Sequence, residues 1–320
     1  MPLLEVRDLT VEFPTRRGVL RALDRVSFAI EAGEVLGVVG ESGAGKSLTG
    51  VAIVGLLERP GRIAGGEVRL DGARIDNLPA ETLRRIRGRR IGMIFQDPLT
   101  TLNPLYTIGR QLTETMQAHL GFSDAEARRR AVAWLERVGI PAAAQRIDAY
   151  PHEFSGGQRQ RVVIALALCA EPALVIADEP TTALDVSIQA QIITLLKELT
   201  RDHGTAVMLI THDMGVIAET ADRVAVMYAG RIAEIGPVGD VIRRSAHPYT
   251  EGLMASIPSL EHRVERLRQI DGSMPRLDAI PSGCRFHPRC PRAFARCSAE
   301  QPDLLAAGAT RAACWLHADG

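Results

Sequence analysis

The stretch GESGAGKS, residues 40–47, decides the fold of this chain: Gly40-Glu41-Ser42-Gly43-Ala44-Gly45-Lys46-Ser47. An apolar run, residues 34–40, precedes it, and a run with helical character, residues 48–57, follows it. A strand, a glycine-rich loop and a helix in this order are the context that the phosphate-binding pattern G-x-x-x-x-G-K-[ST] requires. The glycines allow the backbone to curl, so that successive N–H groups point at one anion. The sequence therefore predicts a phosphate-binding loop, and the alternative is a chance glycine-rich turn.

Two side chains at the end of this stretch extend the prediction to a nucleotide with a metal ion. The N-terminus of the following helix adds a positive electrostatic potential. Lys46 is expected to reach the β- and γ-phosphates, and the Ser47 hydroxyl is expected to ligate Mg²⁺. The loop predicts that a nucleotide binds, and the use of that nucleotide has to be inferred from other residues.

Length, charge and apolar runs limit the class of protein. The 320 residues suffice for one large domain with an appendage or for two domains, and 46% of them are hydrophobic, as in ordinary globular proteins. The formal net charge is zero, which argues against a broad basic surface for nucleic acid. The longest apolar run, residues 162–170, has nine residues, whereas a membrane-spanning helix needs about 20. Residues 1–13 lack the pattern of a signal peptide, so we expect a cytosolic protein. Cys169 lies in an apolar run and is predicted to be an inert core thiol.

The order of predicted strands and helices indicates an α/β fold. Alternation with period two predicts half-buried strands, and continuous apolar runs predict strands buried on both faces. The predicted strands are residues 3–13, 25–30, 34–40, 67–70, 91–96, 174–177 and 206–210, followed by a hairpin over 223–235 that turns at Ala229-Gly230. Residues 60–66 are predicted as a loop, 97–170 as mostly helical, 187–203 as an amphipathic helix, and 237–267 as helical in character. We therefore predict a P-loop NTPase core with an N-terminal antiparallel β subdomain, an inserted helical subdomain and a small, loop-rich, cysteine-bearing C-terminal extension.

A second nucleotide element follows the predicted strand at residues 174–177. The strand ends in Asp178, the position at which P-loop enzymes hold Mg²⁺. The adjacent Glu179 is suited to act as general base for an attacking water. Taken alone, an apolar strand that ends in two acids is common, and helix capping is the alternative interpretation.

A third element, residues 154–161 (FSGGQRQR), precedes a run with helical character. A serine and two glycines at the start of a helix form another anion cradle; the candidate residues are Ser155, Gly156, Gly157 and Gln158. One nucleotide does not need two cradles from the same subunit. We therefore predict a head-to-tail dimer in which each cradle closes over the nucleotide held by the phosphate loop of the partner.

With these elements in this order, the chain resembles the ATP-binding-cassette (ABC) family. Residues 40–47 resemble its Walker A loop, 174–179 its Walker B strand with a catalytic glutamate, and 155–158 its signature motif, with Phe154 in place of the more usual leucine. The resemblance implies roles for four further residues: Gln96 as the Q-loop residue that senses the γ-phosphate and the membrane partner, Asp185 in the D-loop (183–185), His212 as the switch histidine that contacts the γ-phosphate, and Phe13 as the aromatic stacked on adenine. Individually, Gln96, His212 and Phe13 could instead be a polar strand end, a core histidine and a core aromatic.

Further segments resemble the ATPases of the oligopeptide/dipeptide permeases. These are residues 93–98 (MIFQDP), 102–104 (LNP), 150–154 (YPHEF), 178–186 (DEPTTALDV) and 247–250 (HPYT). The resemblance covers nearly the whole chain, although these segments are less specific than the nucleotide motifs. Nickel importers belong to the same subfamily, so they stay an alternative.

Four cysteines near the C-terminus, Cys284, Cys290, Cys297 and Cys314, lie within 31 residues in the spacing C-x₅-C-x₆-C-x₁₆-C. Four soft ligands in a cytosolic chain suggest a thiolate-bound metal centre. Neither early gap matches the structural-zinc spacing C-x₂₋₄-C, and the wide gaps suit an iron–sulfur cluster better. They also resemble the tail of the dipeptide-permease branch, which carries a [4Fe–4S] cluster. Zinc, with His287 or His317 as a further ligand, and no metal at all are the alternatives.

The leading hypothesis is an ATPase subunit that energises ABC-type import of dipeptides or oligopeptides. We expect a nucleotide-binding domain over residues 1–236, with a helical subdomain at about 97–170, and an extension over 237–320. The resemblance implies two separate transmembrane permease subunits, a second ABC ATPase subunit (a heterodimer), an extracytoplasmic substrate-binding protein and a peripheral position at the cytoplasmic face of the inner membrane. It implies no nucleic acid partner. A soluble ABC ATPase acting on DNA or ribosomes and a P-loop phosphotransferase are the other hypotheses.

Overall fold

The computed structural model describes residues 1–181, 186–256 and 269–318. The chain forms two compact units, which we describe separately. The first unit comprises Met1, Ile30–Glu34 and Asn77–Ile210, and the second comprises Pro2–Ala29, Val35–Asp76 and Thr211–Gly320.

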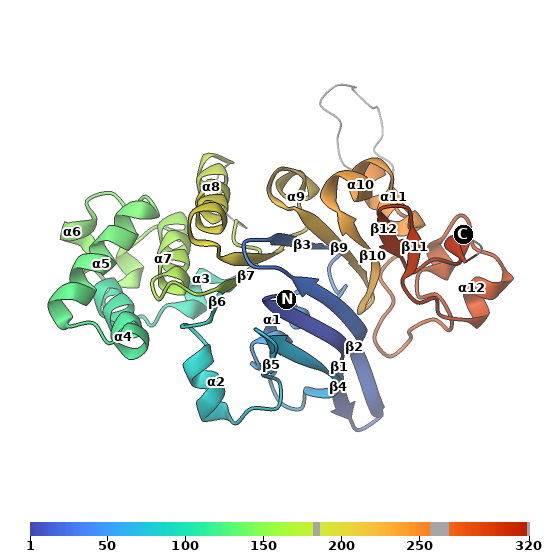
Figure 1. Cartoon of the computed structure of the whole chain (residues 1–320), viewed down its shortest axis with the longest axis horizontal. Coiled ribbons are helices and arrows are strands. Elements are labelled where there is room, and N and C mark those ends of the chain that lie inside the picture. Colours follow the sequence, from blue (N-terminus) through green and yellow to red (C-terminus); the bar gives the residue numbers. More distant parts are fainter. Residues whose placement is uncertain (182–185, 257–268, 319–320) are drawn as a thin grey trace. The chain divides into compact units, whose positions relative to one another are not determined.

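The second unit begins with the predicted antiparallel sheet (Figure 1). Its strands are β1 (Leu4–Thr15), β2 (Gly18–Ile30), β4 (Arg62–Leu70) and β5 (Ala73–Arg74), in the order β2-β1-β4-β5. Apolar side chains of β1 at Leu4, Val6, Leu9 and Val11 are at most 1% exposed. The period-two alternation therefore predicted this subdomain correctly, although β1 and β2 are longer than expected.

The loop predicted over residues 60–66 is partly wrong, because β4 already begins at Arg62. Its register against β1 shifts around Thr10, which lies opposite Gly65. Gly66 has φ +82°, and a Cβ there would lie 2.4 Å from the carbonyl oxygens of Arg7 and Asp8. The two glycines permit a β-bulge and a close backbone crossing, so that residues typical of a loop continue a strand here.

A second sheet of this unit carries the phosphate loop. Its strands are β3 (Val35–Val39), β9 (Arg223–Tyr228), β10 (Arg231–Pro237), β11 (Leu305–Ala307) and β12 (Thr310–Ala312), in the order β11-β12-β10-β9-β3. β3 pairs with β9 in parallel, and the other pairs are antiparallel. The predicted hairpin turn at Ala229-Gly230 is confirmed, with φ angles of 45° and 81°, as a two-residue turn between twisted strands requires.

The described helices of the second unit are α1 (Lys46–Ile53), α9 (Met214–Thr220), α10 (Val238–Arg243), α11 (Pro248–Ala255) and α12 (Ala295–Ala299), with short 3₁₀ turns η2 (His287–Arg289) and η3 (Trp315–His317).

The C-terminal extension attaches to β10 through the fully buried Glu234. Its carboxylate accepts hydrogen bonds of 2.9 Å from the N–H groups of Ala246 and His247, and one of 3.3 Å from the Thr310 hydroxyl. The extension is loop-rich as predicted; of the helical character expected over 237–267, residues 257–267 lie outside the described residues.

In the first unit, three parallel strands run in the order β6-β7-β8: β6 (Ile91–Ile94), β7 (Leu174–Asp178) and β8 (Ala206–Ile210). β7 and β8 are buried along their whole length, as their continuous apolar runs predicted. β6 ends two residues before the predicted end, and the chain bends at Gln96. Helix α8 (Val186–His203) buries Ile192, Leu195 and Leu196, as its spacing predicted.

The predicted helical segment is confirmed (green in Figure 1). It contains α3 (Pro98–Thr101), α4 (Ile108–Leu120), α5 (Asp124–Arg137), α6 (Ala143–Arg146), the 3₁₀ turn η1 (Pro151–Glu153) and α7 (Gly156–Leu168), and α2 (Ala80–Ile86) precedes it. Thr107 and Ser123 cap α4 and α5 with their hydroxyl groups, and Gly121 ends α4 in a left-handed conformation (φ 67°).

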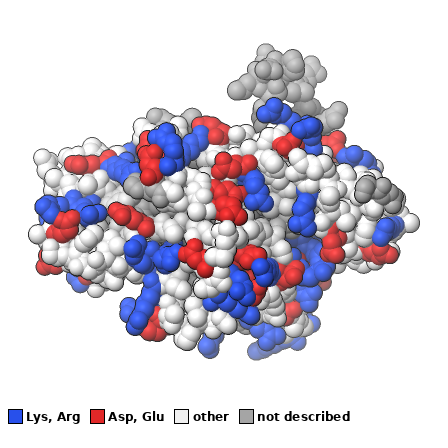
Figure 2. Space-filling model, viewed as in Figure 1, with Lys and Arg blue, Asp and Glu red and all other residues white. Residues whose placement is uncertain are grey.

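Basic and acidic side chains lie next to one another over the face seen in Figure 2. Within the described part of the chain, none of the helices combines the length and the apolar character that crossing a membrane would need.

Candidate nucleotide-binding site

The phosphate loop lies between β3 and α1, where the sequence placed it. Gly40, Gly43 and Gly45 have φ angles of 152°, 81° and 102°. A Cβ at Gly40 would lie 2.3 Å from the Met227 carbonyl oxygen, and one at Gly45 would lie 2.7 Å from a methyl group of Leu23. Glycine is therefore required here by both backbone conformation and space.

Lys46 begins α1 and is 7% exposed. Its Nζ donates hydrogen bonds to the carbonyl oxygens of Gly40 (2.8 Å) and Glu41 (3.1 Å), so the ammonium group lies over the loop. These carbonyl acceptors can be exchanged for phosphate oxygens when an anion enters. Ser47 follows at the first turn of α1, half-buried, and Ser42 is exposed at the rim. Helix α1 is shorter than predicted, because Gly55 adopts φ 68° just beyond its end.

His212 and Phe13 belong to the same unit as the loop. The backbone N–H of Thr211 donates to the carbonyl oxygen of Val38 (3.2 Å), which fixes the start of the segment that carries His212. The His212 side chain is exposed, so the core-histidine interpretation is wrong. Phe13 is half-buried, and its ring lies against Gly61, where a Cβ would be 2.7 Å from a ring carbon.

The first unit brings Gln96 and Glu179 together. Asp178 ends β7 and is 6% exposed. Glu179 follows in the left-handed region (φ 46°), and its N–H donates to the Ile210 carbonyl oxygen at 2.9 Å. Its carboxylate accepts a hydrogen bond of 3.3 Å from the Gln96 amide. The strained turn directs the Glu179 side chain away from the strand and towards Gln96.

Ser155 is the N-cap of α7. Its hydroxyl accepts a hydrogen bond of 3.3 Å from the Gln158 N–H, and the Gln158 side chain accepts one of 3.2 Å from the Ser155 N–H. Ser155 and Gly156 are exposed, and a Cβ built on Gly156 would meet no other described side chain within 4 Å, its chain neighbours apart. Gly157 is half-buried in the first turn. The preceding Phe154, which stands in place of the more usual leucine, is 2% exposed and therefore packs in the hydrophobic core. Asp185 lies outside the described residues.

The four C-terminal cysteines are free thiols in the second unit. The Cys284 N–H donates to the Cys297 carbonyl oxygen at 2.8 Å. Burial and then the three neighbouring thiols raise the pKa of Cys284 to about 11. Burial also raises the pKa of Cys290 and Cys314. Among the described residues, however, no group of three or more histidine, cysteine and acidic side chains is placed to hold a metal ion, so the predicted metal centre is not confirmed.

Cys169, predicted as a core thiol, is 1% exposed, and burial raises its pKa to about 12.

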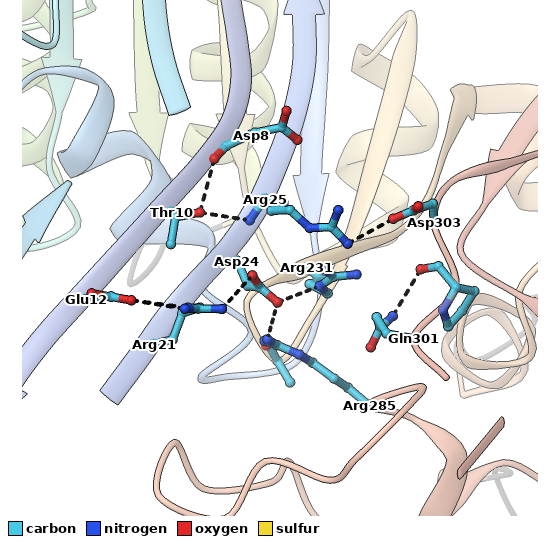
Figure 3. Close-up of polar contacts among 12 residues, drawn as sticks. Asp8, Thr10, Glu12, Arg21, Asp24, Arg25, Arg231, Arg285, Gln301 and Asp303 are labelled. Carbon is cyan, nitrogen blue, oxygen red and sulfur yellow. Dashed lines mark hydrogen bonds and ion pairs between the residues drawn. The ribbon is translucent and has the colours of Figure 1, made fainter. Parts of the chain in front are cut away.

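The sequence did not point to a charged cluster around Asp24 on β2 (Figure 3). The Asp24 carboxylate accepts hydrogen bonds from Arg285 (2.7 Å), Arg231 (2.9 Å) and Arg21 (3.4 Å). Asp24, Arg231 and Arg285 have side chains only 10–13% exposed. Burial alone would raise the pKa of Asp24, but the arginines outweigh it and lower that pKa. Arg285 directly follows Cys284, so this cluster attaches the cysteine segment to the antiparallel sheet.

Replacing Asp24 by asparagine is expected to lower the free energy of unfolding by about 3 kcal/mol near pH 7, since two buried arginines lose their counter-ion. A depressed carboxyl pKa contributes stability above the unfolded-state value of 3.8 and loses it as pH falls through the lower folded-state value. The difference between the two proteins should therefore shrink below about pH 4. Urea unfolding at pH 7 and pH 3.5 measures it. Asp303→Asn is the matched control, because the Asp303–Arg25 pair is exposed and should contribute less than about 1 kcal/mol; equal losses in both variants would contradict the prediction.

The sequence also missed two partners of the phosphate loop. Tyr249 and Arg289, both in the C-terminal extension, bind Glu41. Tyr249 lies in the 247–250 segment that resembled the permease ATPases, but the resemblance assigned it no contact. Arg289 lies between Cys284 and Cys290, and no sequence motif pointed to it.

Comparison with known proteins agrees with this architecture. The "ABC transporter" family model matches residues 23–182, and the model of the "Oligopeptide/dipeptide transporter, C-terminal region" matches residues 233–297. The chain is 50% identical over 300 residues to the oligopeptide transport ATP-binding protein OppD of Salmonella typhimurium, covering 94% of this chain and 89% of the relative. It is 47% identical over 304 residues to AppD of Bacillus subtilis, covering 95% and 93%.

Among solved structures, it is similar to a dimeric ATP-binding cassette in a post-hydrolysis state bound to ADP and Pi, with a TM-score of 0.68, 30% identity and coverage of 73% of this chain and 98% of that one. The predicted fold is thereby confirmed: a mixed α/β P-loop ABC ATPase with an antiparallel β subdomain and a helical insertion. The chain belongs to the ABC transporter ATPases, in the group that carries the oligopeptide/dipeptide transporter C-terminal region.

Proposed function

We propose that this chain is the ATP-hydrolysing subunit that energises import of dipeptides or oligopeptides across the cytoplasmic membrane. The observation that carries the proposal is the presence, in one chain, of a formed phosphate loop and an oligopeptide/dipeptide transporter C-terminal region. The names of the relatives OppD and AppD, oligopeptide transport ATP-binding proteins, support the same cargo.

The described residues suit a site for ATP and Mg²⁺. Loop N–H groups with Lys46 would hold the phosphates, and Ser47 and Asp178 would hold Mg²⁺, which neutralises charge on the phosphates. Glu179 would accept the proton of the attacking water, since its carboxylate is oriented by the Gln96 amide. We further propose Gln96 as a γ-phosphate sensor that can also reach Mg²⁺.

His212 and Phe13 complete the proposed site. The exposed His212 is assigned to the γ-phosphate, and Phe13 to the adenine ring.

We assign the open N-terminus of α7 to the nucleotide of a partner ATPase. Ser155 and Gly156 are exposed, and the free N–H groups of a helix start favour an anion. Gln158 holds Ser155 in place through reciprocal hydrogen bonds, and Gly157 keeps the first turn accessible. ATP would favour the closed dimer and ADP the open one, which makes the pair a switch driven by differential affinity. A heterodimer is proposed, and Asp185 of the D-loop is assigned to the nucleotide site.

The proposed assembly contains two transmembrane permease subunits and an extracytoplasmic substrate-binding protein, with this chain peripheral at the cytoplasmic face. The segment after Gln96 is assigned to the permease contact, and Leu105, at 79% exposure, offers it an apolar side chain. We propose residues 1–236 as the nucleotide-binding domain, with the helical subdomain at about 97–170, and 237–320 as the extension.

We also propose that the four cysteines hold a [4Fe–4S] cluster that staples the extension. The support is the spacing of four cysteines within 31 residues and the backbone hydrogen bond of 2.8 Å from the Cys284 N–H to the Cys297 carbonyl oxygen. A cluster requires thiols that face one shared space, which is a wider arrangement than the ligand shell of a single ion.

Anaerobic purification of the full importer, followed by ATPase assay, tests cargo and tail together. Short peptides presented by the binding protein should stimulate hydrolysis, and about four irons with matching sulfide per chain are expected. Stimulation by nickel and not by peptide would overturn the cargo. Zinc or empty thiols would overturn the cluster and leave the ATPase assignment unchanged.

A further inference from the structure

All three polar groups of Glu41, the second residue of the phosphate loop, are engaged. Its carbonyl oxygen accepts a hydrogen bond from Lys46 (3.1 Å), and its N–H donates one to the Tyr249 hydroxyl (2.9 Å). Its carboxylate accepts two from the Arg289 guanidinium, at 2.9 and 3.1 Å. The backbone carbonyl oxygen also accepts the Ala44 N–H at 3.2 Å, so two of these four partners, Tyr249 and Arg289, belong to the C-terminal extension, more than 200 residues away in sequence.

Arg289 is itself fixed before it reaches the loop. Its Nε donates to the Asp271 carbonyl oxygen at 2.7 Å and its Nη2 to the Ile270 carbonyl oxygen at 3.3 Å. The side chain is 8% exposed, and that of Glu41 is 26% exposed. A planar guanidinium held in this way meets a carboxylate with both donors, which a lysine cannot do.

Tyr249 is held as firmly as Arg289. It is fully buried, with its ring 4.7 Å from that of Tyr228 and 5.3 Å from that of Phe286. Its backbone N–H donates to His247 Nδ1 at 3.0 Å. The hydroxyl that accepts the Glu41 N–H is therefore placed by packing, and the position of that N–H follows from it.

The extension reaches the loop at two further points. Met274 lies over Gly43, with its Cγ 3.8 Å from the place a Cβ would occupy. Arg285 donates to the Ala229 carbonyl oxygen, and the neighbouring Gly230 N–H donates to the Ala44 carbonyl oxygen at 2.8 Å. Loop residues 41 and 44 are thus held, directly or through the β9–β10 turn, by residues beyond 236, and Met274 lies next to Gly43.

We propose that Arg289 and Tyr249 are positioning residues for ATP, which pre-organise the phosphate loop and neutralise the Glu41 carboxylate beside the triphosphate. The proposal rests on the proposed role of residues 40–47 in binding phosphate. A glycine-rich loop loses much conformational freedom when it closes on an anion, and ordering it beforehand removes part of that cost from binding. Without Arg289, the Glu41 charge would oppose the phosphates.

The test is the dissociation constant of ATP for the full chain, with KM and kcat for hydrolysis. Arg289→Ala should weaken binding about tenfold and raise KM more than it lowers kcat, and the loss should diminish at high salt. Arg289→Lys should lie between this variant and the wild type. Tyr249→Phe, which removes only the hydroxyl, should weaken binding about threefold. Arg276→Ala is the matched control, because Arg276 is in the same extension, is exposed, and within the described part of the chain its guanidinium pairs with Asp278.

A rescue separates this role from a general structural one. Glu41→Gln in the Arg289→Ala background removes the uncompensated charge and should recover about half or more of the lost affinity on a logarithmic scale. Wild-type affinity in Arg289→Ala, or a double variant as weak as the single one, would overturn the proposal. If Arg289→Ala does not fold, Arg289→Lys and Tyr249→Phe decide the question. Lys46→Ala is measured in parallel: retained ATP binding there would overturn the loop assignment, whereas its loss with unchanged Arg289 variants would overturn only this inference.

Discussion

Replacing Glu179 by glutamine is expected to lower ATP turnover about 10²–10⁴-fold while ATP binding persists. Glu179 directly follows the buried strand β7, has a left-handed backbone conformation (φ 46°), and its carboxylate accepts a hydrogen bond from Gln96. Glutamine keeps the size of the side chain but cannot take a proton from water. ATP should then hold the ATPase subunits in the closed dimer, which size-exclusion chromatography with ATP and Mg²⁺ would detect.

Glu171→Gln is the matched control for this experiment. Glu171 lies before β7, at the opposite end from Glu179, and also has a positive φ (52°). Its carboxylate pairs with Arg130 at 3.4 Å on the surface, so turnover should stay within about twofold of the wild type. A normal turnover rate in Glu179→Gln would contradict the general-base assignment, and a loss in both variants would indicate a structural effect.

Replacing Lys46 by alanine is expected to weaken ATP binding about 100-fold, which corresponds to about 3 kcal/mol. The ammonium group now donates to two loop carbonyl oxygens, and phosphate oxygens are stronger, charged acceptors for the same donors. Equilibrium binding of a fluorescent ATP analogue measures the change.

The chain has one other lysine, Lys197, which offers a control. It lies on α8, and Lys197→Ala should leave ATP binding unchanged. Because there are only two lysines, amine acylation followed by mass spectrometry gives an independent readout. ATP should protect Lys46 from acylation and leave Lys197 as reactive as before; equal reactivity of Lys46 with and without ATP would contradict its contact with phosphate.

Much of the fold was predictable because its information is local. The phosphate loop needs three glycines with positive φ and a lysine at the next position, and all are neighbours in the sequence. Buried strands such as β7 and β8 show as continuous apolar runs, and residues 97–170 were recognised as mostly helical.

One error occurred where a distant strand overrides local preference. Residues 62–66 contain two adjacent glycines and read as a loop, yet they pair with β1 across a bulge. The candidate site followed the same rule. Gln96 and Glu179 were each recognised, but the hydrogen bond between them joins residues 83 positions apart and could not be inferred from either.

By itself the sequence determined the class of nucleotide-binding ATPase, since phosphate loops, acidic strand ends and helix caps are short motifs whose chemistry follows from adjacent residues. Only the tertiary structure showed how the C-terminal extension contacts the phosphate loop and the antiparallel sheet. Glu41 and Arg289 are 248 positions apart, and Asp24 and Arg285 are 261 apart. The ion-pair partner of an arginine cannot be inferred from its neighbours in the sequence, because ion pairing depends on which surfaces the packed core brings together.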